Sequence, residues 1–134
     1  IDMSSTSALH VAIYNGGGVY KHWSLFIDGP TEKTILNIVG SSTRYRFEER
    51  DSNARESATL VELVYLCDVD DSKISAIKDA ADKMTIRNEA PGYNCQDYIL
   101  DLLDHLEGKS IINGNNANYK KNRETVEGKQ EGLN

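Results

Sequence analysis

The stretch from Gly92 to Glu107 constrains the fold most, because it carries the periodic pattern of a helix directly after a chain-breaking turn. Pro91 and Gly92 form the turn signal, and Asn94 stands where a helix N-cap belongs. Apolar residues then recur at three- and four-residue spacing, at Ile99, Leu102, Leu103 and Leu106. The stretch predicts a helix that begins at about Cys95 and buries one face.

Cys95 falls in the first turn of this predicted helix. Unpaired backbone N–H groups and the helix dipole stabilise an anion there, so the thiol pKa is expected to fall from about 8.5 toward neutrality. The alternative is a small buried residue at a helix start, since free cysteine is among the most buried residue types. A nucleophilic role requires a base within reach of the sulfur.

The residues before this helix predict strands. The expected strands cover residues 8–14, 19–27, 33–40, 44–49 and 59–67, and a further helix is expected over 73–84. The first two strands flank the glycines at 16–18, which is typical of an antiparallel hairpin. A strand-rich half followed by two helices predicts an α+β fold, in which an antiparallel sheet of about five strands packs against two or three helices.

The chain is expected to form one domain over residues 8–108. Residues 1–7 are small and polar, and we expect them to be loose. From residue 109 onward asparagine, glycine, lysine and glutamate dominate, and the apolar pattern stops. This composition predicts a disordered polar tail over residues 109–134.

Composition and spacing argue against several functions. The net charge of −6 and the absence of a basic run favour neither nucleic acid nor an anionic membrane as a partner. No apolar run reaches the roughly 20 residues of a membrane span, no signal peptide opens the chain, and two cysteines suit a reducing compartment, so we expect a cytoplasmic protein. The Cys and His residues lack paired zinc spacing, the glycines at 16–18 do not open a helix, and no cofactor is expected.

Three histidines are candidates for the base. His105 lies ten residues beyond Cys95 on the same predicted helix, about 15 Å along its axis, and cannot reach the sulfur. His10 and His22 lie on the first two predicted strands, where side chains alternate between two faces. Spacing alone does not choose between them.

Two short blocks resemble the lecithin:retinol acyltransferase-like family. Residues 20–29 read YKHWSLFIDG and residues 94–98 read NCQDY, where the family has a His-Trp-Ala-Leu-Tyr strand motif and an Asn-Cys-Glu-His-Phe motif at a helix start. The resemblance extends over about Leu9 to Glu107. It implies a permuted papain-like fold with Cys95 as the nucleophile and His22 as the general base.

The sequence departs from the family pattern at Asn37, and at Gln96 and Asp97, which replace the family's Glu-His. Asn37 stands where family members usually carry a second histidine or another polar residue, and we expect its carbonyl to accept the Nδ1–H of His22. The alternative is a polar residue on the exposed side of an edge strand. Tyr20, Asn94 and Gln96 are candidates for oxyanion or substrate binding, although Tyr20 is also a candidate packing residue.

The resemblance implies acyl transfer through a thioester, on an ester or an amide, with hydrolase and acyltransferase both open. The expected substrate is a small molecule, an acyl compound or a peptide, and no metal or organic cofactor is needed. One alternative is a cysteine peptidase or amidase of the same fold. The other is a binding or effector-like module that keeps the fold without turnover.

Overall fold

A computed structural model describes residues 5–16 and 18–131 of the chain. These residues form a five-stranded antiparallel sheet and three α-helices, so the predicted α+β class is confirmed. The strands are β1 (Thr6–Tyr14), β2 (His22–Asp28), β3 (Lys33–Val39), β4 (Arg46–Asp51) and β5 (Leu60–Asp70). The helices are α1 (Ile74–Lys83), α2 (Cys95–Gly108) and α3 (Ala117–Glu127), with short 3-10 turns at Ala54–Glu56 and Asp71–Lys73.

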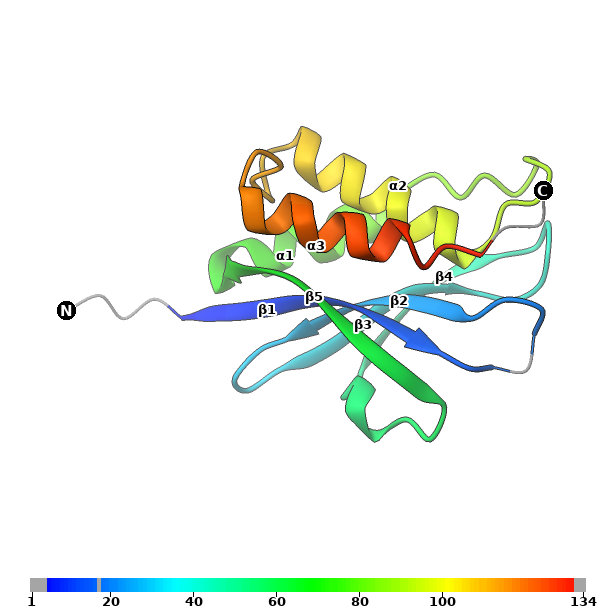
Figure 1. The fold of residues 1–134 in the computed structure, drawn as a ribbon, viewed down its shortest axis with the longest axis horizontal. Helices are drawn as coiled ribbons and strands as arrows, with labels where there is room; N and C mark the ends of the chain where they lie inside the picture. Colours follow the sequence, from blue (N-terminus) through cyan, green and yellow to red (C-terminus); the bar gives the residue numbers. More distant parts are fainter. Residues whose placement is uncertain (1–4, 17, 132–134) are drawn as a thin grey trace.

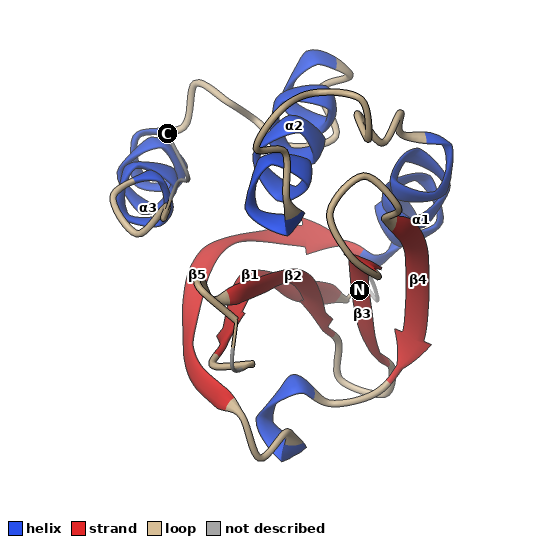
Figure 2. Ribbon diagram, turned by 90° about the vertical axis from the view of Figure 1, so that its right-hand side faces the viewer, coloured by secondary structure: helices blue, strands red, loops and turns tan. Residues whose placement is uncertain are grey.

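The sheet has the strand order β4-β3-β2-β1-β5. The first four strands follow one another as a meander, and β5 returns to pair with β1 at the other edge. Figure 2 shows that the sheet is strongly curved and that all three helices cover its convex face. The Ala54–Glu56 turn lies on the concave side (Figure 2).

Alternation along β2 divides its side chains between the two faces of the sheet. Trp23, Leu25 and Ile27 belong to the main core, which packs against the helices. Phe26 belongs to a second apolar cluster on the concave face, together with Ala12, Tyr14, Ile35 and Ala54. By the same alternation His22 points toward the concave face, whereas Cys95 lies in the core on the helix side.

The prediction of a disordered tail is corrected by α3. Asn116 caps this helix by accepting a hydrogen bond from the Tyr119 backbone N–H at 2.9 Å, and Tyr119 and Val126 are buried. Asn122 Nδ2 donates to the backbone carbonyl of Leu66 in β5 at 3.0 Å. The apolar pattern was too sparse to indicate a helix, because α3 is fixed largely by polar contacts.

The prediction of a loose N-terminal segment is corrected for residues 5–7, while residues 1–4 lie outside the described residues. Thr6 and Ser7 belong to β1, and the hydroxyls of Ser5 and Ser7 both bond to the carboxylate of Asp71. Of the predicted glycine turn between the first two strands, Gly17 is likewise outside the described residues.

Candidate functional site

The N-terminus of α2 places Cys95. Asn94 is the N-cap, and its side chain accepts a hydrogen bond from the Gln96 N–H at 2.9 Å. Asp97 Oδ2 accepts from the Asn94 N–H at 2.9 Å, which completes a capping box. The predicted helix start is therefore confirmed, and Cys95 is the first helical residue.

The Cys95 thiol is buried against the backbone at the start of β2. The residue is only 3% exposed, and Sγ lies 3.9 Å from the carbonyl oxygen of Lys21. Burial raises the thiol pKa to about 11, although the backbone N–H groups of Trp23, Cys95 and Gln96 point to the sulfur and lower it. The expected fall of this pKa is thus corrected: desolvation outweighs the helix terminus, and the resting thiol is protonated.

Asn37 fixes the ring of His22 and its tautomer. The Nδ2 group of Asn37 donates to the Glu48 backbone carbonyl at 3.1 Å and to Glu48 Oε1 at 3.3 Å. Its Oδ1 therefore faces His22, whose Nε2 lies 2.7 Å away. An amide oxygen only accepts, so Nε2 must carry the proton.

This geometry corrects the expected pairing of Asn37 with Nδ1 of His22. The partner is Nε2, and the lone pair of the neutral ring is therefore on Nδ1. Burial lowers the pKa of His22, opposed by the Asn37 hydrogen bond, while the positive charge of Arg50 also lowers it and Glu48 raises it. The ring is consequently neutral at neutral pH, with Nδ1 able to accept a proton.

One cleft of about 530 Å³ is lined by both Cys95 and His22. Its wall contains the aromatic residues Tyr14, Tyr20 and Tyr45 and the cationic side chain of Arg50. Within residues 18–131, no hydrogen bond joins the Cys95 thiol to the His22 ring. The two groups share a cleft but are not bonded in the resting structure.

The other predicted site residues have different environments. Tyr20 lines the cleft, and its hydroxyl lies 2.8 Å from the Tyr45 hydroxyl. Asn94 is 2% exposed and is engaged in capping α2, so its side chain is not free for a substrate. Gln96 is fully buried, and both ends of its amide bond within the protein, to Lys21 and Glu131.

Sequence reasoning did not identify Tyr45 and Arg50 as cleft residues. Tyr45 lies just before β4 and Arg50 lies within it, and neither residue belongs to a motif that indicates a site. The β3–β4 register, in which Asn37 pairs with Glu48 and Ile35 with Arg50, places β4 beside β3, the strand that carries Asn37. No local sequence signal indicates this register.

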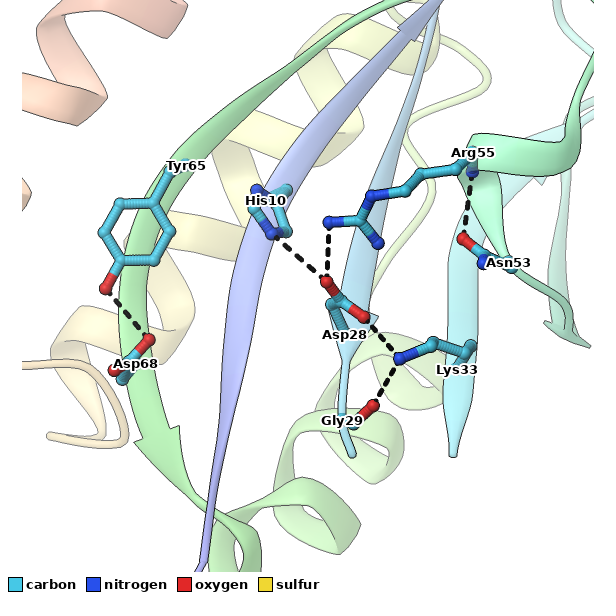
Figure 3. Close-up of polar contacts among 8 residues, drawn as sticks. All are labelled: His10, Asp28, Gly29, Lys33, Asn53, Arg55, Tyr65 and Asp68. Atoms are coloured by element: carbon cyan, nitrogen blue, oxygen red, sulfur yellow. Dashed lines mark hydrogen bonds and ion pairs between the residues drawn. The ribbon is translucent and has the colours of Figure 1, made fainter. Parts of the chain in front are cut away.

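His10 does not belong to the residues that line this cleft. Its ring lies between Phe26 and Tyr65 on the concave face, with centroid separations of 5.9 and 5.7 Å. His10 Nε2 is 3.8 Å from Asp28 Oδ2, and the same carboxylate pairs with Lys33 at 2.8 Å and with Arg55 at 2.7 Å (Figure 3). Burial lowers the pKa of His10 despite the nearby Asp28. The cluster therefore contains a neutral histidine beside a carboxylate whose charge is balanced by Lys33 and Arg55.

Across residues 5–16 and 18–131 there is no group of three or more His, Cys, Asp or Glu side chains arranged to hold a metal ion. No helix in that part of the chain has both the length and the apolar character needed to cross a membrane.

A family model described as a family of unknown function, DUF6540, matches residues 9–113, which is well over half of the chain. The match includes β1 from Leu9 onward, β2 to β5, α1 and α2, and therefore Cys95, His22 and Asn37, but not α3. No curated protein and no solved structure matches the chain.

Proposed function

The chain belongs to the DUF6540 family of unknown function, and we propose that it is a thiol enzyme that transfers an acyl group through a thioester on Cys95. The observation that carries this proposal is the shared cleft. Cys95 at the start of α2 and His22 at the start of β2 line the same 530 Å³ space, although they come from distant parts of the sequence. A nucleophile, a base and an orienting third group are the parts such chemistry requires.

The Asn37 contact supports His22 as the base. With Nε2–H donated to Asn37, the ring presents Nδ1 as its proton acceptor. Papain-like proteases use a Cys-His-Asn arrangement, and the strand and helix motifs resemble the permuted form of that fold. We therefore assign Asn37 as the residue that orients His22.

The proposed reaction has two steps. His22 Nδ1 takes the thiol proton while Sγ attacks the carbonyl carbon of an ester or amide, and the proton then passes to the departing alcohol or amine. Water or an amine acceptor attacks the thioester next, with His22 again as base, and releases Cys95 as the thiol. The Cys95 N–H and the Tyr20 hydroxyl are the proposed donors to the oxyanion.

The resting site must rearrange for this reaction. The Cys95 sulfur faces the Lys21 carbonyl, and it is not hydrogen-bonded to His22 in the described structure. We propose that the thiol turns from Lys21 toward the cleft that His22 lines before it reacts. A neutral thiol and a neutral imidazole suit general-base deprotonation during attack, rather than a preformed thiolate–imidazolium pair.

The cleft supports an ester or amide of small size as the substrate. Three tyrosines give it flat, partly polar walls, and Arg50 provides a positive charge at its edge. A cysteine peptidase or amidase would use the same groups on a peptide bond. Both cysteines are free, which favours a reducing compartment such as the cytoplasm.

A binding module is the second candidate, and the burial of Cys95 favours it. The thiol of a residue that is 3% exposed, with a pKa raised to about 11, is a poor nucleophile unless the site opens. In this second case the cleft holds a ligand without turnover.

Hydrolysis of p-nitrophenyl acetate and of the corresponding anilide tests the proposal. The wild-type protein should release p-nitrophenol faster than Cys95→Ala, whereas Cys67→Ala should match the wild type because Cys67 lies on β5, outside the cleft. Equal rates for the wild type and Cys95→Ala with both compounds would contradict an enzymatic role and favour the binding module. Turnover of the anilide would favour the amidase form.

A further inference from the structure

A closed ring of three hydrogen bonds joins Lys21, Gln96 and Glu131. Gln96 Nε2 donates to the Lys21 carbonyl at 2.8 Å, and the Glu131 N–H donates to Gln96 Oε1 at 2.7 Å. The Lys21 N–H donates to Glu131 Oε1 at 2.9 Å, which closes the ring. We call this ring the three-residue clamp.

The clamp lies directly beside both proposed catalytic residues. Lys21 immediately precedes His22, and Gln96 immediately follows Cys95. Gln96 is fully buried, and its two partners, one an acceptor and one a donor, fix the orientation of its amide. The backbone that carries the base is thereby tied to the backbone that carries the nucleophile.

The third member of the clamp comes from outside the region that matches the family. Glu131 follows α3, whereas the family match ends at residue 113. Figure 1 shows that the chain after α3 runs beside the start of α2. Arg123 holds α3 to α2 through ion pairs with Asp104 and Glu107, so α3 brings Glu131 to the clamp.

We propose that Gln96 and Glu131 are positioning residues that set the geometry of Cys95 relative to His22, and that the segment after α3 completes the site. The proposal rests on the proposed function, because it assigns the clamp a role in that reaction. Small displacements between reacting groups cost large factors in rate, so a tie one residue from each group has leverage on the reaction. Gln96 thus acts on the backbone behind the site rather than on the substrate.

A double-mutant cycle with His22 tests this role. Glu131→Ala removes the acceptor of the Lys21 N–H and should lower the rate of p-nitrophenyl acetate cleavage about tenfold. In a His22→Asn background the same change should have little further effect, because there is no base left to position. Glu131→Gln keeps an acceptor oxygen and should restore most of the rate. Glu124→Ala, which removes an exposed carboxylate from α3, is the matched control and should leave the rate unchanged.

The outcomes separate the clamp from the reaction itself. An equal loss from Glu131→Ala in both backgrounds, or no rescue by Glu131→Gln, would overturn the positioning role. If the His22→Asn variant cleaves p-nitrophenyl acetate at the wild-type rate, the proposed function fails. Hydrogen exchange then tests the clamp independently of activity. Faster exchange of the Lys21 amide in Glu131→Ala than in Glu124→Ala would support the clamp as a structural tie, whereas equal exchange would overturn that also.

Discussion

Asn37 uses both ends of its amide, and this single residue determines which nitrogen of His22 is left free to accept a proton. Its Nδ2 is engaged by Glu48, so its Oδ1 receives the Nε2–H of the ring. At 1% exposure the amide is held away from competing water. The family resemblance predicted Asn37 as the partner of His22, with an exposed polar residue on an edge strand as the alternative. The nitrogen that Asn37 contacts depends on the direction from which the two side chains approach.

Replacement of Asn37 by aspartate should move the acid limb of activity. Burial lowers the pKa of His22, so in the wild type the rate should remain high until the pH falls below the ordinary histidine pKa of about 6.5. A carboxylate beside Nε2 stabilises the imidazolium and raises this pKa, so Asn37→Asp should lose activity at a higher pH. The rate of p-nitrophenyl acetate cleavage is measured from pH 5 to 8 for both proteins. If the pH at which activity is lost is the same in both, residue 37 does not contact the base.

The raised pKa of Cys95 predicts its alkylation profile. Because burial favours the neutral thiol, the iodoacetamide rate at Cys95 should keep rising with pH toward about 11. In urea-unfolded chain the rise should level off near the ordinary cysteine pKa of about 8.5. Peptide mapping separates Cys95 from Cys67. A plateau at neutral pH for Cys95 in the folded protein would instead show a preformed thiolate.

The helix α3 is an element that apolar spacing in the sequence does not predict. The strands and the first two helices were predictable because alternation and three- and four-residue spacing mark their buried faces. In α3 only Tyr119 and Val126 are buried apolar residues. The helix is held by the hydrogen bond from its Asn122 to β5 and by the ion pair of its Arg123 with α2. Such polar contacts depend on elements far away in the sequence, so composition alone suggested disorder.

Arg123→Ala should loosen α3 more than the rest of the fold. Its guanidinium pairs with Asp104, Glu107 and Glu127, and its loss leaves the partly buried carboxylate of Glu107 without a counter-charge. We expect a loss of about 1–3 kcal/mol in the free energy of unfolding. Urea titration measures this loss, and hydrogen exchange should be fastest within α3.

Lys120→Ala is the control for this prediction, since it removes an exposed cation from the same helix. If Arg123→Ala and Lys120→Ala have equal stability, the ion pairs at Arg123 do not hold α3.

At the scale of the whole molecule, the curved sheet separates two polar sites that the sequence left as alternatives. His10 and His22 both point to the concave face, yet His10 belongs to the Asp28 cluster and only His22 lines the cleft with Cys95. The strand assignments predicted that both histidines lie on paired strands. The choice between them requires the position of α2 at the end of β2, which follows from packing and not from local pattern.

The three-dimensional arrangement also changes the electrostatics expected at Cys95. A helix terminus alone would lower the thiol pKa, but packing against Trp23 and the Lys21 backbone removes water from the sulfur. The same packing places Cys95 in the wall of the cleft that His22 also lines. Burial therefore positions the thiol at the cleft while favouring its protonated form.

Trapping the acylated protein tests whether Cys95 carries the acyl group with His22 as its base. The protein is mixed with p-nitrophenyl acetate, quenched in acid at short times and mapped by peptide mass spectrometry. We expect one acetyl group on Cys95, formed more slowly in His22→Asn and absent from Cys95→Ala. Acetylation confined to lysines or Cys67, or an equal rate on Cys95 without His22, would contradict these roles.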